Sequence, residues 1–205
     1  MIATHDLRKI LRPLATACSE PEEGRFYVRR ENFFDATTFV ALVVMLATGA
    51  RVTETCSLRV ADVDLAEGFL LLQGKGRRQR RVPLTDERSV QLLSSYLACR
   101  VLAAHAHDRL LCNDRGLPLA PGSLRIRLHR TVKAAGVKRR VTPHMLRHTA
   151  ATRLLDSGTD IRYIQRLLGH AHLATTEIYT HVSSRSLRDA LAAADALREV
   201  WEDDN

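Results

Sequence analysis

Residues 142–180 contain the side chains whose types and spacing could do chemistry. His144 and Arg147 stand three residues apart, so on a helix they share one face. Thr142 is suited to the N-cap and Pro143 to the first helical position, so we expect a helix to begin there. The sequence therefore predicts a helix that presents an imidazole and a guanidinium on the same side.

A second signal follows in Leu168-Gly169-His170. Gly169 is expected to end an apolar helix, which places His170 in the turn after it. Tyr179 then lies on a short polar helix. An arginine and two histidines near an available tyrosine hydroxyl indicate an anionic substrate and a tyrosine nucleophile.

Two upstream motifs extend this pattern. Residues 48–54 read TGARVTE and contain Arg51, while Lys75 stands between two glycines ahead of the run Arg-Val-Pro-Leu at 81–84. Together with the downstream motifs, they resemble the tyrosine recombinase (phage integrase) family from about residue 34 to residue 182. The resemblance assigns six catalytic positions in the family's order: Arg51, Lys75, His144, Arg147, His170 and the nucleophile Tyr179.

The resemblance implies an α+β fold, a mainly α-helical recombinase catalytic domain with a small antiparallel β-hairpin or sheet. It also implies cleavage and rejoining of duplex DNA without a metal or other cofactor. Arg51 and Arg147 would hold the non-bridging oxygens of the reacting phosphate, and His170 would donate a further hydrogen bond. Glu54, three residues after Arg51, would orient a partner in the active site.

The proton transfers follow from the nucleophile. Attack by Tyr179 would give a 3′-phosphotyrosine and a free 5′-hydroxyl. Because an unperturbed tyrosine has a pKa of about 10, a base must take its proton, and His144 is the better-placed group. Lys75 would protonate the departing 5′-oxygen.

The charge balance also favours a polyanionic partner. The formal net charge is +8 over 205 residues, and the isoelectric point is about 9.8. We expect DNA contacts from the tip of a β-hairpin and from the exposed face of a helix over 122–135, although a merely solvated basic face remains an alternative. These residues are Arg77, Arg78 and Arg80 on the hairpin and Arg125, Arg127, Arg130 and Lys133 on the helix.

Other classes of protein fit poorly. There is no run of about 18 apolar residues for a membrane span and no apolar signal core at the N-terminus. Four scattered cysteines indicate reduced thiols, which favours a cytoplasmic protein. The family resemblance further implies a nucleoid-associated protein of a prokaryote or mobile element. His144 and His148 have zinc-helix spacing, and His170 and His172 could complete a site, but Arg147 would bring a cation beside the metal, so we predict none.

Hydrophobic periodicity predicts the remaining elements. A first helix from residue 4 to 17 should bend or end at Pro13. The run FVALVVMLA predicts a buried helix over 35–47. Further helices are expected at 51–58, 86–104, 122–135, 143–156, after Asp160 and at 187–201, with a hairpin formed by 68–73 and 80–83.

These elements suggest three parts: a short helix and linker (1–24), the catalytic domain (25–182) and a C-terminal helix (183–205). Most family members carry a helical DNA-binding domain ahead of the catalytic domain, so this chain is either a fragment or a naturally short member. The final helix would dock on its own domain or on a neighbouring protomer. In the second case the expected assembly is a tetramer on paired DNA sites, and a monomer remains possible in the free state.

Two other interpretations remain. A type IB topoisomerase shares the tyrosine and the arginines, but the closeness of the Leu-Gly-His motif to Tyr179 favours a recombinase. A non-catalytic DNA-binding protein on the same scaffold should have lost a catalytic residue, and none of the six is missing.

Overall fold

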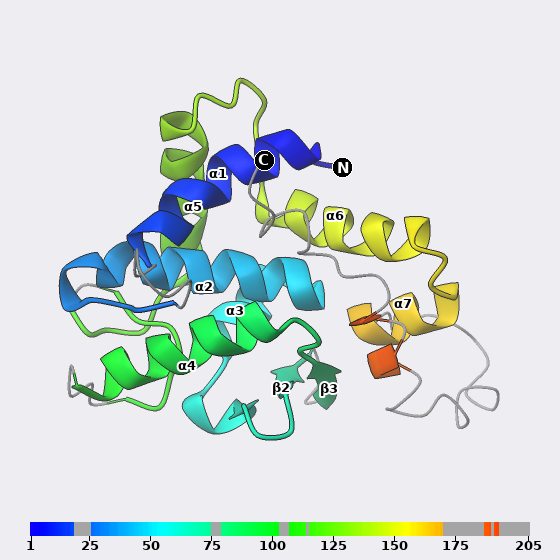
Figure 1. The fold of residues 1–205 in the computed structure, drawn as a ribbon, viewed down its shortest axis with the longest axis horizontal. Helices are drawn as coiled ribbons and strands as arrows, with labels where there is room; N and C mark the ends of the chain where they lie inside the picture. Colours follow the sequence, from blue (N-terminus) through cyan, green and yellow to red (C-terminus); the bar gives the residue numbers. More distant parts are fainter. Residues whose placement is uncertain are drawn as a thin grey trace.

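The protein is described here by a computed structural model, shown in Figure 1. The structure describes residues 1–18, 26–74, 79–102, 107–113, 115–169, 187–189 and 191–192. The predicted site residues Lys75, Arg77, Arg78, His170 and Tyr179 lie outside these ranges.

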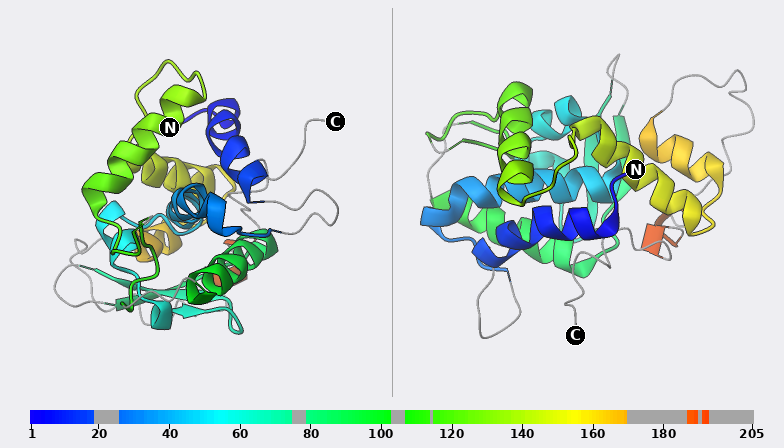
Figure 2. Two further views of the ribbon diagram at one scale, coloured as in Figure 1. Left: turned by 90° about the vertical axis from the view of Figure 1, so that its left-hand side faces the viewer. Right: turned by 90° about the horizontal axis from the view of Figure 1, so that it is seen from above.

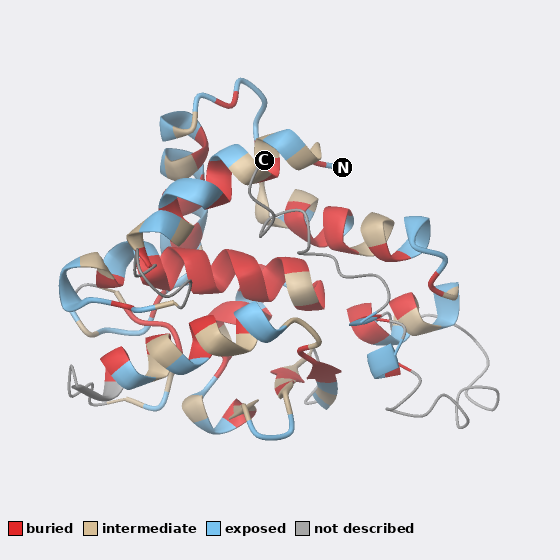
Figure 3. Ribbon diagram, viewed as in Figure 1, coloured by how far each residue is buried: buried red, intermediate tan, exposed pale blue. Residues whose placement is uncertain are grey.

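One buried helix forms the centre of the fold. Helix α2 (Phe33–Thr48) is apolar on nearly every face, and Figure 3 shows it buried along most of its length. A helix without a polar face needs neighbours all around it. It has them in α1 (Thr4–Ala17), α3 (Val52–Ser57), α4 (Glu87–Leu102), α5 (Pro121–Ala134) and α6 (Pro143–Asp156).

Within the described part of the chain, the same apolarity gives one segment that could cross a membrane by length and composition alone. That segment is Arg30–Thr48, and 72% of its most apolar window is buried inside the structure. Its hydrophobic side chains are therefore those of a core helix.

Helix α1 belongs to this core. Its inner stripe of Leu7, Ile10, Leu11 and Leu14 is buried, as the spacing predicts. Of the two outcomes expected at Pro13, a bend or an end of the helix, the end does not occur, because α1 continues to Ala17. The buried stripe holds the helix against α2 on both sides of the proline, and this packing offsets the missing backbone donor.

A small antiparallel sheet flanks the helices. Strands β1 (Val63–Asp64), β2 (Phe69–Gln73) and β3 (Gln79–Pro83) lie in that order. Leu70 pairs with Val82, and Leu72 pairs with Arg80. The hairpin and the α+β class are confirmed, whereas β1 was not predicted because two residues are too few to show alternation.

The helices that carry the sequence motifs begin and end as their cap residues predict. Helix α6 starts at Pro143, and the Thr142 hydroxyl accepts the Met145 N–H at 3.3 Å. Helix α7 (Ile161–Leu168) is capped at its N-terminus by the Asp160 carboxylate, which accepts a hydrogen bond from the Arg162 backbone N–H. The helix ends at Gly169, whose φ is 63°. The fold thus sets the turn before His170 at a defined place.

Only the beginning of the expected C-terminal helix is described. Leu187 and Leu191 are buried in the common core, and the Arg188 guanidinium donates a hydrogen bond to the Glu67 carbonyl. Figure 2 shows these short helical pieces beside the sheet and α7. This part of the tail therefore packs on its own chain.

Candidate active site

Arg147 is a buried cation held between two helix ends. Its Nη1 donates to the Gly49 carbonyl and its Nη2 to the Leu168 carbonyl, each at 2.7 Å. Gly49 caps α2 and Leu168 is the last residue of α7, so both acceptors are carbonyls that a helix leaves without an internal partner. One side chain on α6 thereby fixes three helices relative to one another.

The close approach of these ends requires a glycine. Gly49 has a φ of 61°, in the left-handed region that other residues rarely adopt. A Cβ atom at that position would stand 2.6 Å from Cδ2 of Leu168, which is closer than real atoms come. Any larger residue would have to displace the Leu168 side chain, at the end of α7 whose carbonyl Arg147 binds.

Arg147 also lies in an electropositive environment. Burial, followed by the nearby cations Arg51 and Arg80, lowers its pKa to about 10, although Glu54 opposes the shift. The guanidinium still carries its charge at neutral pH. An anion between Arg147 and Arg51 would relieve this repulsion, so the site favours a phosphate or a similar ligand.

Arg51 occupies the N-cap position of the short helix α3, two residues after Gly49. Its backbone N–H donates to Oε2 of Glu54 at 2.8 Å, and its Nη1 donates to Oε1 at 2.9 Å. The side chain remains 44% exposed. Among the described residues, its Nε and Nη2 have no hydrogen-bond partner, so these donors are available to a ligand.

Glu54 is the carboxylate that organises this corner. It is only 4% exposed and accepts hydrogen bonds from both Arg51 and Arg80. Burial alone would raise its pKa, but the hydrogen bonds and charges of Arg80 and Arg51 outweigh burial and lower the pKa to about 2. Glu54 is therefore an anion throughout the physiological range.

This shift predicts a pH dependence of stability. Because the folded pKa is below the ordinary 4.5, Glu54 contributes stability above pH 4.5 and loses it as the pH falls toward 2. Glu54→Gln should lower the melting temperature at pH 7, since breaking a buried ion pair costs roughly 3–5 kcal/mol. The variant should also lose less stability than the wild type as the pH falls from 4.5 toward 2, because it lacks the carboxylate that titrates there. Melting curves test this, with the exposed Glu67→Gln as the matched control. An acid profile identical to wild type would contradict the assignment.

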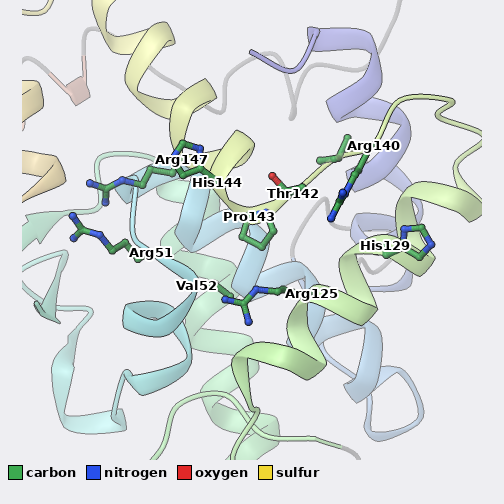
Figure 4. A pocket seen from close by; sticks show the side chains of 10 residues that line it. Arg51, Val52, Arg125, His129, Arg140, Thr142, Pro143, His144 and Arg147 are labelled. Atoms are coloured by element: carbon green, nitrogen blue, oxygen red, sulfur yellow. The ribbon is translucent and has the colours of Figure 1, made fainter. Parts of the chain in front are cut away.

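The side chains converge on a pocket of about 450 Å³, seen from close by in Figure 4. Arg51, His144 and Arg147 gather at one end, and further basic side chains come from α5 and from the segment before α6. None of the lining residues that the structure describes carries a carboxylate. The basic residues that line the pocket are Arg51, Arg125, His129, Arg140, His144 and Arg147.

The structure thus brings together three of the six predicted catalytic residues: Arg51, His144 and Arg147. The other three lie outside the described residues, but their neighbours are placed. Lys75 lies in the sequence between β2, which ends at Gln73, and β3, which begins at Gln79, and His170 directly follows Gly169.

The predicted DNA-binding residues divide into two groups. Arg125, Arg130 and Lys133 are exposed on α5, as expected from the pattern. The expectation of an exposed position is wrong for Arg127, which is buried with its guanidinium 3.8 Å from the centre of the Phe34 ring and donates to the Phe34 carbonyl at 3.1 Å.

Arg80 is the second correction. Its side chain is 13% exposed and hydrogen-bonded to Glu54 and to the Leu167 carbonyl, so it does not belong to a solvated basic tip. Sequence reasoning also missed Arg140 and His129, which line the pocket. Arg140 could have been found from its position, because it stands two residues before Thr142, the N-cap of the helix that carries His144 and Arg147.

Metal ligation has no support within the described ranges. No group of three or more His, Cys, Asp or Glu side chains with metal-binding geometry occurs there. His148 is exposed on α6.

Comparisons with known proteins agree with the motifs. A model of the phage integrase family matches residues 21–185. The tyrosine recombinase XerC of Bacillus subtilis (strain 168) is 42% identical over 152 residues, which are 72% of this chain and 50% of that protein. The XerC of Listeria welshimeri is 40% identical over 175 residues, which are 83% of this chain and 58% of that protein.

Solved structures give the same result. The XerA recombinase matches with a TM-score of 0.69 and 35% identity, covering 92% of this chain and 62% of that one. The XerH site-specific recombinase bound to a palindromic difH substrate matches with a TM-score of 0.67 and 30% identity, covering 92% of this chain and 51% of that one. The chain spans about half the length of the curated relatives it matches.

Proposed function

Because the chain belongs to the phage integrase family of tyrosine recombinases, we propose that it carries the catalytic domain of a site-specific recombinase. It cuts duplex DNA, holds the cut strand as a 3′-phosphotyrosine and rejoins it to a new partner. The observation that carries this proposal is the pocket in which Arg51 and Arg147 stand together with no carboxylate among its described lining residues.

The chemistry is an in-line displacement at phosphorus. The Tyr179 oxygen forms a bond to phosphorus while the bond to the 5′-oxygen of the DNA breaks. The extra negative charge that develops on the non-bridging oxygens is stabilised by Arg51 and Arg147. Both side chains are held before the substrate arrives, so little reorganisation is needed during the reaction.

Proton transfers complete the step. His144 lies one helical turn before Arg147 and lines the same pocket, so it is the base that takes the phenolic proton. Lys75 gives a proton to the departing 5′-oxygen. His170 follows the turn whose Leu168 carbonyl Arg147 binds, which supports its role as a further donor to the phosphate.

The far end of the pocket is proposed to bind the neighbouring phosphates of the same DNA strand. Arg125, His129 and Arg140 line it with exposed basic side chains. Arg130 and Lys133 extend this surface along α5. Arg77 and Arg78, which lie in the sequence between β2 and β3, remain proposed DNA contacts.

This surface predicts a specific salt dependence. The double variant Arg125→Ala, Arg140→Ala should bind duplex DNA more weakly and lower the slope of log K against log salt by about 2, since each lost phosphate contact removes about one unit. The cleavage rate at saturating protein should change far less. Fluorescence anisotropy at several salt concentrations measures the slope. A double variant of the exposed Arg12 and Arg115 is the control, and an unchanged slope in the pocket variant would contradict the surface.

We also propose assembly as a tetramer on paired DNA sites. In the structure Leu187 and Leu191 pack on their own chain, so docking of the tail on a neighbour would require this contact to be exchanged. Because the tail follows Tyr179 closely, such an exchange would couple cleavage to assembly. The proposed place of action is DNA in the cytoplasm of a prokaryote, either chromosomal or mobile.

Two assays separate this function from the alternatives. A recombinase joins DNA between two sites, whereas a type IB topoisomerase relaxes supercoils without pairing sites and a non-catalytic binder does neither. The protein should convert a two-site plasmid into recombinant products, with light scattering showing a larger assembly on two-site than on one-site DNA. Relaxation of a plasmid without a site, and no recombinant product, would favour the topoisomerase.

A further inference from the structure

Arg80 is a charged residue turned toward the interior of the protein. On β3 its neighbours Gln79 and Arg81 are exposed, whereas Arg80 pairs across the sheet with the fully buried Leu72. Side chains of directly paired residues lie on the same face of a sheet. The strand register therefore directs the Arg80 guanidinium toward α3 and α7, and no DNA-facing position is left for it.

The guanidinium forms a bidentate pair with Glu54. Nη1 donates to Oε1 at 3.0 Å and Nη2 donates to Oε2 at 2.8 Å. Such paired bonds fix geometry as well as charge, and a lysine could not reproduce both. Each carboxylate oxygen accepts one further hydrogen bond, and Arg51 donates both of them.

This sharing determines how Arg51 is held. Because Arg80 occupies one edge of the carboxylate, Arg51 reaches Glu54 through its backbone N–H and Nη1 alone. Nε and Nη2 of Arg51 are left for a phosphate. If Arg80 were removed, the vacated oxygens would attract the Arg51 guanidinium away from the pocket.

A second contact reaches the end of α7. Arg80 Nε donates to the Leu167 carbonyl at 2.7 Å, next to the Leu168 carbonyl that Arg147 binds. Two arginines from different elements thus hold consecutive carbonyls at one helix end. Gly169 leaves room for this arrangement, because a Cβ there would stand 3.2 Å from Arg80 Nη1.

We propose that Arg80 is a positioning residue of the cleavage reaction, which keeps Arg51 directed at the reacting phosphate and fixes the turn that leads into His170. This inference rests on the proposed recombinase function. In this role Arg80 acts through the hydrogen bonds that it donates to Glu54 and to the α7 carbonyl.

The first test compares Arg80→Gln and Arg80→Lys with the neighbouring Arg81→Gln. Arg81 is exposed and its guanidinium stacks 3.6 Å from the centre of the Phe69 ring, so its loss removes one charge from the same strand. Single-turnover cleavage of a nicked suicide duplex is measured at saturating protein, and duplex affinity and melting temperature are measured beside it. Both Arg80 variants should cleave roughly 10²-fold more slowly, as expected of a small misplacement, with affinity nearly unchanged. Arg81→Gln should cleave at nearly the wild-type rate.

The second test separates positioning from general damage. A substrate with a neutral methylphosphonate at the reacting position needs less charge stabilisation from Arg51. Arg80→Lys retains a charge and is the variant expected to stay folded. On the methylphosphonate substrate, the factor by which it cleaves more slowly than the wild type should therefore shrink at least about tenfold, and the same holds for Arg51→Ala. An equal defect on both substrates, or a normal rate on the phosphate, would overturn the inference. Failure of the wild-type protein to form any adduct would instead overturn the proposed recombinase function.

Discussion

Arg147→Ala is expected to abolish strand cleavage and also to destabilise the protein. Loss of a preorganised donor to a developing oxyanion typically costs roughly 10²–10³ in rate. Here the Gly49 and Leu168 carbonyls also lose their partner, so the ends of α2 and α7 separate and the rate falls further. Single-turnover cleavage and thermal unfolding, measured on the same preparations, give the two effects.

Arg51→Ala provides the matched comparison. The Arg51 side chain is partly exposed and, among the described residues, is hydrogen-bonded to Glu54 alone. Its loss should therefore slow cleavage to a similar extent with a smaller drop in melting temperature. Duplex affinity should change little in either variant, because affinity is distributed over many phosphate contacts. Near wild-type cleavage by Arg147→Ala would mean that this arginine only holds the helices together.

Tyr179→Phe is expected to leave no detectable covalent adduct and no recombinant product. The substitution removes a single oxygen, so folding and DNA binding should match the wild type. Adduct formation on a suicide substrate, affinity and melting temperature are compared with Tyr27→Phe, which changes an exposed tyrosine far from the motifs. An adduct that persists in Tyr179→Phe would assign the nucleophile to another residue.

Much of the helical framework could be predicted from the sequence because its signals are local. Thr142 with Pro143, Asp160 and Gly169 mark the ends of α6 and α7 within a few residues of themselves. The apolar run in α2 predicts its burial from composition alone. The pairing of Arg51 with Glu54 follows from their spacing across the first turn of α3.

The roles of individual arginines could not be predicted in the same way. Arg80 and Arg127 belong to basic runs, and the local sequence does not distinguish a buried arginine from an exposed one within such a run. Their burial depends on contacts with Glu54 and Phe34, which lie 26 and 93 residues away along the chain. Strand alternation gives a partial signal for Arg80, because two exposed residues flank it.

Pro13 shows the same limit in a helix. The local rule predicts that the helix bends or ends, because proline removes a backbone donor and crowds the preceding turn. The tertiary contacts of Leu7, Leu11 and Leu14 with the core outweigh that preference, and α1 continues. Long-range packing, rather than propensity, decides the outcome at this position.

The most direct test of the recombinase proposal is to trap the covalent intermediate. The protein is incubated with a suicide duplex that carries a nick beside the cleavage site, so that the short 5′-hydroxyl fragment diffuses away and religation is prevented. We expect a protein–DNA adduct that forms in the presence of a chelator, with the 3′-phosphate mapped by peptide mass spectrometry to Tyr179. A duplex that carries the site and is bound tightly but never becomes covalently attached, or an adduct on any other residue, would contradict the account.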